Sequence, residues 1–183
     1  MHEGLNPSVW VKKCAAFLKP RSSVLDLACG SGRHARYLAD KGHDVTGLDK
    51  NIEVLSQISM RKDIQTLQYD LELSAWPFPD RKFDAIVVTN YLYRPILANI
   101  VDSLSPSGVL IYETFMVGNE RFGRPSSPDF LLRPNELIEV THGKLQVVMY
   151  ESGRVSRPKP ALVQRICAVV NHSEYFETAL TDE

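Results

Sequence analysis

Short apolar segments alternate with amphipathic segments along most of the chain. The apolar segments have the length of β-strands, and in the segments between them apolar side chains recur at the spacing of an α-helix. The predicted strands are residues 23–28, 44–49, 64–70, 83–89 and 109–115, the predicted helices are 33–41, 51–60 and 94–103, and residues 105–108 are a predicted turn. Such an alternation forms βαβ units, so the pattern predicts a parallel sheet covered by helices.

The alternation then breaks. Residues 116–133 contain glycine and proline but little periodicity, and we predict a long loop of the kind that is usually functional or mobile. Pro134 suits the first turn of a helix, which we expect to end at Thr141. The last two predicted strands, 145–151 and 162–170, are joined by a segment too short for a crossover helix, so we expect them to be antiparallel.

The composition narrows the class of protein. The 183 residues fit one domain over residues 1–183, and 44% hydrophobic with 23% charged residues is typical of a folded globular chain. A net charge of -1 disfavours a generally basic nucleic-acid-binding protein. No apolar run reaches the roughly 20 residues of a membrane-spanning helix, and the N-terminus lacks a signal-peptide core. We therefore expect a cytoplasmic protein without membrane contact.

The cysteines and histidines show no pattern of a metal or disulfide site. Cys14, Cys29 and Cys167 are odd in number and lack a C-x-x-C spacing, so neither a disulfide framework nor a structural zinc site is expected. The five histidines are scattered and form no ligand pair at metal-binding spacing. The sequence thus predicts chemistry without a metal.

A glycine-rich turn joins the first predicted strand to the first predicted helix. Gly30, Gly32 and Ala35 fit the pattern G-x-G-x-x-A. Glycines at such a turn let a ligand approach the backbone closely, and the helix start supplies free N–H donors, as in nucleotide-binding sites. The alternative is an ordinary strand-to-helix turn that needs a positive φ angle.

Two acidic residues sharpen this interpretation. Asp49 ends the second strand, where a carboxylate is placed to accept hydrogen bonds from ribose hydroxyls and disfavours the 2′-phosphate of NADP. Asp26 lies within an otherwise apolar strand, and a buried carboxylate is costly unless it is hydrogen-bonded or faces a cation. A ligand with an ammonium or sulfonium cation suits this position better than a pyrophosphate. The alternative for Asp26 is a structural carboxylate that accepts backbone N–H groups.

The segment Val24-Leu-Asp-Leu-Ala-Cys-Gly-Ser-Gly32 resembles motif I of the class I S-adenosylmethionine-dependent methyltransferases. Residues 45–49, 69–71 and 104–110 resemble later motifs of this family, with Ser107 in place of a family glycine. The small size resembles the compact tellurite-resistance type. The resemblance implies a doubly wound, Rossmann-like α/β fold with seven mostly parallel strands in the order 3-2-1-4-5-7-6, in which strand seven is antiparallel.

The resemblance also implies which residues bind S-adenosyl-L-methionine. Asp49 holds the ribose hydroxyls, Asp70 accepts from the adenine amino group, and Leu71 packs on the adenine ring. Gly30 and Gly32 pass close under the cofactor. The full predicted cofactor-binding set is Asp26, Ala28, Gly30, Gly32, Asp49, Lys50, Asp70, Leu71 and Asn90, with Asp26 and Asn90 near the methionine part.

Residues that follow the fourth and fifth strands are candidates for contact with the methyl acceptor, because these strand ends lie near the switch point of such a sheet. Tyr91 and Tyr93 offer ring faces to a sulfonium, and Glu113 is a candidate general base. The alternatives are packing for the tyrosines and a structural salt bridge for Glu113. His34 could titrate near neutral pH, but a surface position is the commoner role for a histidine at a helix start.

Residues 116–133 are the candidate substrate loop. Arg121 and Arg124 within it, and Arg133 at its end, are candidates to clamp an anionic substrate through two-point guanidinium contacts. The alternative is a solvated surface with internal ion pairs.

Residues 1–22, before the first strand, form a short N-terminal cap. Trp10 and Phe17 are expected either to cover the cofactor or to pack on the sheet edge. So short an N-terminal segment offers little surface for a macromolecular substrate, and we therefore expect a small-molecule acceptor. We expect the methyl transfer to proceed by in-line displacement. The alternatives are an NAD-binding oxidoreductase, a non-enzymatic cofactor-binding protein and a methyltransferase that acts on RNA. The sequence does not indicate an oligomeric state.

Overall fold

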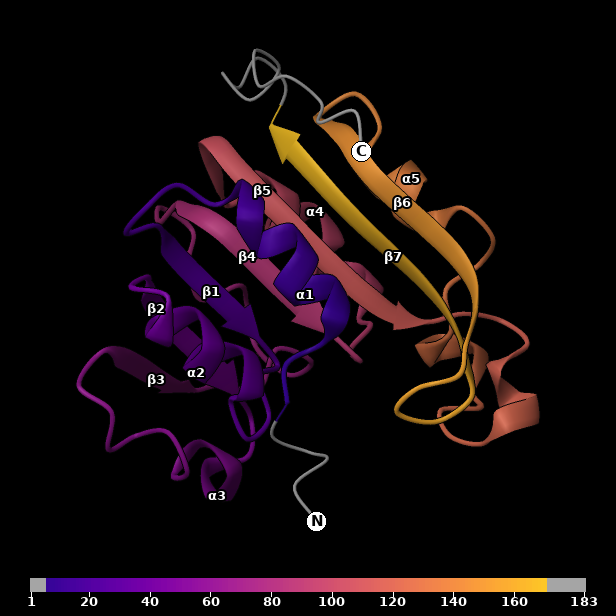
Figure 1. The fold of residues 1–183 in the computed structure, drawn as a ribbon, viewed down its shortest axis with the longest axis horizontal. Coiled ribbons are helices and arrows are strands. Elements are labelled where there is room, and N and C mark those ends of the chain that lie inside the picture. Colours follow the sequence, from indigo (N-terminus) through magenta and orange to yellow (C-terminus); the bar gives the residue numbers. More distant parts are fainter. Residues whose placement is uncertain (1–5, 171–183) are drawn as a thin grey trace.

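The computed structural model describes residues 6–170, which form a seven-stranded sheet between two layers of helices (Figure 1). The strands are β1 Ser23–Leu27, β2 Asp44–Asp49, β3 Ile64–Gln68, β4 Phe83–Thr89, β5 Leu104–Phe115, β6 Leu145–Val155 and β7 Ala161–Val170. Their order is β3-β2-β1-β4-β5-β7-β6. Strand β7 runs antiparallel to both β5 and β6, and all other neighbouring strands are parallel. The predicted fold class and the antiparallel last pair of strands are therefore confirmed.

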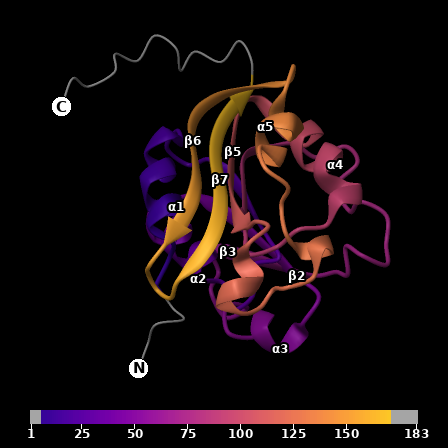
Figure 2. The same cartoon turned by 90° about the vertical axis from the view of Figure 1, so that its right-hand side faces the viewer.

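Helices cover both faces of the sheet. They are α1 Val9–Cys14, α2 Arg33–Asp40, α3 Ile52–Leu55, α4 Leu97–Asp102 and α5 Glu136–Thr141, with the short 3-10 helices η1 Ala15–Phe17, η2 Arg94–Ile96, η3 Asn119–Phe122 and η4 Pro128–Phe130. Helices α1, α2 and α3 lie on one face, and α4 and α5 lie on the other (Figure 2).

Two apolar clusters, one under each helical layer, share the central strands. In β1, Val24 belongs to the cluster under α1 and α2, and Leu25 belongs to the cluster under α4 and α5. Because both faces are covered, the central strands need apolar side chains on both sides, which explains their continuous apolar sequences.

The N-terminal cap packs on the sheet. Trp10 in α1 is 1% exposed, and its indole N–H donates to the carbonyl of Ile166 in β7 at 3.3 Å. Phe17 packs, partly buried, against the same apolar cluster. These contacts support the packing alternative for the cap, whose residues 1–5 lie outside the described part of the chain.

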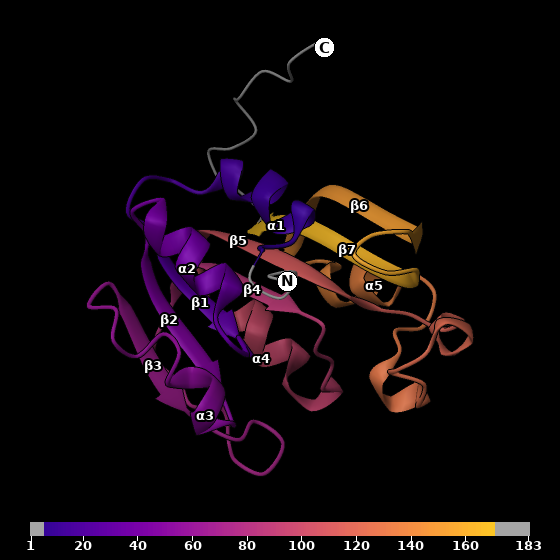
Figure 3. The same cartoon turned by 60° about the horizontal axis from the view of Figure 1, so that its bottom comes forward.

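The parallel strands all end at one edge of the sheet, which we call the carboxyl edge. The ends of β1 at Leu27, β2 at Asp49 and β4 at Thr89 lie there, and the loops that follow are grouped in Figure 3. In open α/β sheets, ligands bind at this edge where neighbouring strands connect in opposite directions. Here that switch point lies between β1 and β4.

The prediction of a helix over residues 51–60 is wrong in the length of the helix. Only α3, Ile52–Leu55, is helical, and turns follow it. The hydroxyls of Ser56 and Ser59 each donate to the backbone carbonyl three residues earlier. Such bonds give the backbone an alternative to regular helix, which explains the early end of α3.

The helix predicted to start at Pro134 starts two residues later. Helix α5 begins at Glu136, because Asn135 has φ 63° and therefore lies in the left-handed region. Strand β6 also extends four residues beyond the predicted end at residue 151.

The predicted turn at residues 105–108 lies inside β5. Strand β4 pairs with Leu104 of β5 and then with Val109, so residues 105–108 form an irregularity in the strand pair. A bulge of this kind inserts residues into one strand while pairing continues on both sides, so a local turn signal does not end the strand.

Within residues 6–170, no helix is long and apolar enough to cross a membrane. The three cysteines are buried and unpaired. The same residues contain no group of three or more metal-ligating side chains arranged to hold a metal ion. A cytoplasmic location stays a prediction.

Candidate functional site

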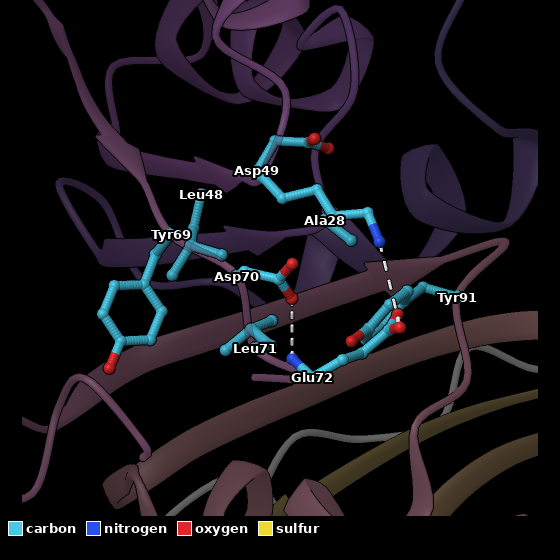
Figure 4. A pocket seen from close by; sticks show the side chains of 9 residues that line it. Ala28, Leu48, Asp49, Tyr69, Asp70, Leu71, Glu72 and Tyr91 are labelled. Carbon is cyan, nitrogen blue, oxygen red and sulfur yellow. Dashed lines mark hydrogen bonds and ion pairs between the residues drawn. The ribbon is translucent and has the colours of Figure 1, made fainter. Parts of the chain in front are cut away.

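A cavity of about 170 Å³ opens at the carboxyl edge of the sheet (Figure 4). Its lining residues are Ala28, Leu48, Asp49, Lys50, Tyr69, Asp70, Leu71, Glu72 and Tyr91. They come from the ends of β1, β2, β3 and β4 and the loops that follow. The structure thus brings together six residues that the sequence analysis placed in one site.

Asp49 is fixed at the end of β2 by two backbone hydrogen bonds. Its Oδ2 accepts the N–H of Gly30 at 2.8 Å, and its Oδ1 accepts the N–H of Asn51 at 2.9 Å. The first bond ties the glycine turn to strand β2. An ionised carboxylate has about four acceptor positions, so Asp49 keeps capacity for two hydroxyl groups of a ligand.

Residues 70–72 form a turn after β3 that makes one wall of the pocket. The Oδ1 of Asp70 accepts the backbone N–H of Glu72 at 2.9 Å, which fixes the turn. Leu71 is 5% exposed and presents its apolar side chain to the cavity. A hydrogen-bond acceptor beside an apolar surface suits a flat ring that bears an amino group.

The glycine turn leaves open space above Gly30. Gly30 has φ +55°, and a Cβ at this position would meet no atom within 4 Å. Gly32 has φ +72°, but its Cβ would lie 2.6 Å from the side chain of Ile58. The absence of a side chain at Gly32 therefore serves packing, and the room for a ligand lies over Gly30.

Asp26 lies in β1 beneath this turn and is 1% exposed. Its Oδ2 accepts the N–H of Ala35 in α2 at 2.9 Å, whereas its Oδ1 has no hydrogen-bond partner among residues 6–170. Burial is the largest cause that raises the pKa of Asp26 to about 7. The structural hydrogen bond that the sequence left open is therefore present, and it involves one of the two carboxylate oxygens.

Tyr91 lines the pocket, whereas Tyr93 lies beside it. The carbonyl of Tyr91 accepts the hydroxyl of Tyr112 at 2.9 Å, which holds the loop after β4 against the core. The hydroxyl of Tyr93 donates to the carbonyl of Glu72 at 3.3 Å. Burial, with the nearby carboxylates of Glu72 and Asp70, raises the pKa of Tyr91. Its phenol stays protonated at neutral pH and is able to donate a hydrogen bond.

Glu113 is held in an ion pair outside the pocket lining. Its Oε1 accepts the hydroxyl of Ser8 at 2.7 Å, and its Oε2 lies 3.2 Å from Nη1 of Arg165. Alternation along β5 directs Tyr112 to the opposite side, into the cluster under α4 and α5. The salt bridge that the sequence left as an alternative for Glu113 is therefore present.

His34 is buried, and the expected surface position is wrong. The side chain is 1% exposed, its Nε2 accepts the N–H of Ser8 at 3.2 Å, and its Nδ1 lies 3.3 Å from Oγ1 of Thr89. Burial, reinforced by Arg33, lowers the pKa of His34 to about 3. The imidazole is thus neutral at physiological pH.

The predicted arginine clamp is not assembled as a unit. The guanidinium of Arg133 pairs with Glu139 at 3.1 Å and with Glu136 at 3.5 Å. Arg121 donates to a backbone carbonyl of its own loop at 3.1 Å, and Arg124 is exposed. Arg133 therefore forms the internal ion pairs that the sequence analysis gave as the alternative. Substrate contact by Arg121 and Arg124 stays a proposal.

Arg94, which sequence analysis did not select, holds one end of the candidate substrate loop. Its Nε and Nη2 donate to the carboxylate of buried Glu136 at 2.7 and 3.0 Å. Its other N–H groups donate to the carbonyls of Asp129 and Leu131 at 2.9 and 2.8 Å. The end of the loop is thus fixed against the segment that follows β4.

Residues 24–108, from β1 into β5, match the family of methyltransferase domains. The match indicates a class I, S-adenosylmethionine-dependent methyltransferase domain, of which it covers the part from β1 to the first residues of β5. The matched residues include every residue that lines the pocket. The family that the motif after β1 indicated is confirmed.

Two curated relatives illustrate the similarity in sequence. The putative methyltransferase YqeM of Bacillus subtilis (strain 168) is 34% identical over 57% of this chain and 47% of its own length. The demethylmenaquinone methyltransferase of Renibacterium salmoninarum is 32% identical over 52% of this chain and 42% of its own length. The chain thus spans about half the length of these methyltransferases.

Solved methyltransferases share the fold. TehB from Haemophilus influenzae superposes with a TM-score of 0.72 at 24% identity, over 87% of this chain and 61% of that chain. Coclaurine N-methyltransferase bound to N-methylheliamine and S-adenosylhomocysteine superposes with a TM-score of 0.66 at 12% identity, over 87% of this chain and 71% of that chain. At these identities the likeness shows a common architecture and leaves the substrate open.

The predicted cofactor residues outside the cavity surround the switch point between β1 and β4. They are Asp26, Gly30, Gly32 and Asn90, the last of which follows β4 with φ 55°. Sequence analysis missed the lining residues Leu48, Tyr69 and Glu72. The first two flank predicted acids in the sequence, and Glu72 lies two residues after Asp70 on the same turn, which is the signal that could have found it.

Proposed function

We propose that the protein transfers a methyl group from S-adenosylmethionine to a small-molecule acceptor. The pocket between β2 and β3 supports this most directly, because two carboxylates flank an apolar slot. We assign Asp49 to the ribose hydroxyls, Asp70 to the adenine amino group and Leu71 to the adenine ring. When bound, S-adenosylmethionine supplies a methyl group that its sulfonium has already activated.

Residues around the switch point suit the methionine part. Gly30 offers exposed backbone, and Asp26 offers a buried carboxylate oxygen without a partner among residues 6–170. In its ionised form Asp26 attracts a cation, as the ammonium and sulfonium of the donor require. We assign Asn90 and Gly32 to the same region, and Ala28 and Lys50 to the cavity beside the ribose site.

Tyr91 is our candidate for contact with the reacting groups. It lines the pocket and follows β4, and a tyrosine ring stabilises a cation by ~0.5–2 kcal/mol. We propose an in-line displacement, for which the main task of the protein is to orient donor and acceptor, a contribution of roughly 7–11 kcal/mol. Tyr93 and Glu113 are bound to other residues, so we propose that they position the site.

The relatives and the exposed arginines guide the choice of acceptor. The relatives include enzymes named for demethylmenaquinone and coclaurine. We propose a small-molecule acceptor, and exposed Arg121 and Arg124 favour one that carries a negative charge.

Calorimetry with S-adenosylhomocysteine tests the cofactor site. We expect the wild-type protein to bind this compound and Asp49→Ala to lose about 10- to 100-fold in affinity, because charge-assisted hydrogen bonds are removed. Asp80→Ala removes an exposed carboxylate outside the pocket and is the matched control. Tight binding of NAD in place of S-adenosylhomocysteine would support the oxidoreductase alternative and contradict the proposal.

Transfer of a labelled methyl group to panels of phenols, amines and carboxylic acids tests the acceptor. We expect turnover with at least one small molecule. Turnover with RNA alone would replace the proposed acceptor class, and cofactor binding without any turnover would support the non-enzymatic alternative.

A further inference from the structure

Lys50 and Glu72 face each other across the pocket. Lys50 follows β2, and Glu72 ends the turn after β3. The Nζ of Lys50 lies 3.8 Å from Oε2 of Glu72. Figure 4 shows the Glu72 side chain directed toward Tyr91, and a dashed line marks the ion pair of Glu72. The pair therefore connects the two walls between which the adenosine part is proposed to bind.

Backbone contacts hold both partners while their side chains remain accessible. The N–H of Glu72 donates to Asp70 at 2.9 Å, and its carbonyl accepts the hydroxyl of Tyr93 at 3.3 Å. The carbonyl of Lys50 accepts an N–H of the Gln68 side chain at 3.3 Å. The side chains are 59% exposed for Lys50 and 35% for Glu72. An ion pair between such groups is weak and screened by salt, so it is able to open and re-form.

The cavity that the pair spans is small for its ligand. Its volume of about 170 Å³ lies below the roughly 300–1,000 Å³ typical of small-molecule sites. We propose that Lys50 and Glu72 form a clasp, which opens to admit the adenosine part of the cofactor and closes again over it. This inference rests on the proposed function, because it assigns the pocket to that cofactor.

A clasp controls the rate of cofactor exchange more than the affinity. Lys50→Met and Glu72→Gln each remove the ion pair. The cofactor then binds without the pair having to open first, and it dissociates without the closed pair slowing its release. We expect the association and dissociation rate constants for S-adenosylhomocysteine both to rise about two- to fivefold, the range set by a weak ion pair. For Glu72→Gln, which removes the pair but leaves every residue assigned to cofactor binding in place, the dissociation constant is expected to change less than about twofold, since the two rates rise together.

Salt distinguishes the clasp from a merely structural contact. High ionic strength screens the pair, so wild-type rates are expected to rise toward those of the variants, while the rates of the variants stay constant. The charge-swapped variant K50E/E72K restores an attractive pair and is expected to restore slow, salt-sensitive exchange. Lys62→Met, which changes an exposed lysine outside the pocket, is the control and is expected to keep wild-type rates.

Stopped-flow fluorescence of the full chain mixed with S-adenosylhomocysteine, at low and high salt, measures these rates, since Tyr69 and Tyr91 line the pocket. Wild-type rates and salt dependence in both single variants, with the ligand still bound, would overturn the clasp and leave the proposed function standing. Failure of the wild-type protein to bind S-adenosylhomocysteine would overturn both.

Discussion

Asp26 has one carboxylate oxygen bonded to α2 and a second without a partner in the described part of the chain. Because burial disfavours the charged form, its pKa rises from an ordinary 3.8 to about 7. Between these values the folded protein binds more protons at Asp26 than the unfolded chain does. Stability is therefore lost as the pH rises from about 4 to 7, and the loss is complete above pH 7.

Asp26→Asn removes this pH dependence. Relative to wild type, the variant is expected to gain about 2–4 kcal/mol in free energy of unfolding between pH 4 and pH 8, since the full change in pKa corresponds to roughly 4 kcal/mol. Urea denaturation at pH 4, 6 and 8 measures the difference, with Asp80→Asn as a control that follows the wild-type profile. Parallel pH profiles for Asp26→Asn and wild type would contradict a costly buried carboxylate.

Gly30→Ala and Gly32→Ala distinguish a glycine that gives a ligand access to the backbone from a glycine that is required for packing. Both place a Cβ on left-handed backbone, which costs roughly 1–2 kcal/mol. At Gly32 the new atom also lies 2.6 Å from Ile58, so we expect a further loss of about 1–3 kcal/mol there. Gly30→Ala has open space and is expected to stay folded but to bind S-adenosylhomocysteine about tenfold or more weakly.

Thermal unfolding and calorimetry measure the two effects separately. Equal destabilisation by the two substitutions, together with unchanged affinity in Gly30→Ala, would show that the open space above the glycine turn is not where the ligand lies.

The sequence could place Asp49, Asp70 and Tyr91 in one site, because each lies at or just after the end of a predicted strand and these ends reach the same edge of the sheet. It failed for His34, because that side chain is covered by Ser8, which lies 26 residues away in the sequence. No local pattern reports a contact of this separation. The roles of the site residues stay proposals.

Among the secondary-structure elements, central strands were predicted more closely than helices. The observed bounds of β2 and β4, Asp44–Asp49 and Phe83–Thr89, agree with the predicted ones. Burial on both faces favours mostly apolar strands, such as the run Ala85–Val88 in β4, which is a strong signal. The bounds of α3 and α5 depend instead on serine hydroxyls and on one left-handed residue, which periodicity does not show.

The ion pair of Arg94 with Glu136 tests how firmly the candidate substrate loop is held. Arg94→Met is expected to cost about 2–4 kcal/mol in free energy of unfolding, because Glu136 is 3% exposed and loses its closest cationic partner. Replacement of both residues, as R94M/E136L, is expected to cost less than the sum of the two single losses, since no buried charge is left behind.

Urea denaturation of the three variants measures this coupling, and hydrogen exchange reports the loop. Faster exchange of the backbone amides of residues 129–131 is expected in Arg94→Met, because the guanidinium that donates to the carbonyls of Asp129 and Leu131 is lost. Additive losses with unchanged exchange would mean that the ion pair does not fix the loop.

For the molecule as a whole, the two apolar clusters share the strands between them, so the helical layers depend on one sheet. We therefore expect residues 6–170 to unfold as one cooperative unit. Trp10→Ala is expected to destabilise this unit by about 3–5 kcal/mol, since Trp10 is 1% exposed between α1 and the sheet. Tryptophan fluorescence and far-UV circular dichroism should give coincident transitions. Two separate transitions would contradict the single-domain prediction.

The strand order came from the resemblance at Val24–Gly32, because alternation predicts parallel pairing without fixing which strands are neighbours. The hairpin of β6 and β7 could be derived directly, since its connection is too short for a crossover. The arrangement of the candidate substrate loop could not be derived from the sequence. There, Arg94 joins residues 128–131 to the loop after β4, a tertiary arrangement without a local signal.

A crystal structure with S-adenosylhomocysteine tests the assigned pocket most directly. We expect the ribose hydroxyls at the carboxylate of Asp49, the adenine between Asp70 and Leu71, and the amino acid part near Asp26 and Gly30. A cavity that stays empty at saturating ligand, or a ligand bound away from the carboxyl ends of β1, β2 and β3, would contradict the proposed site and the methyl transfer assigned to it.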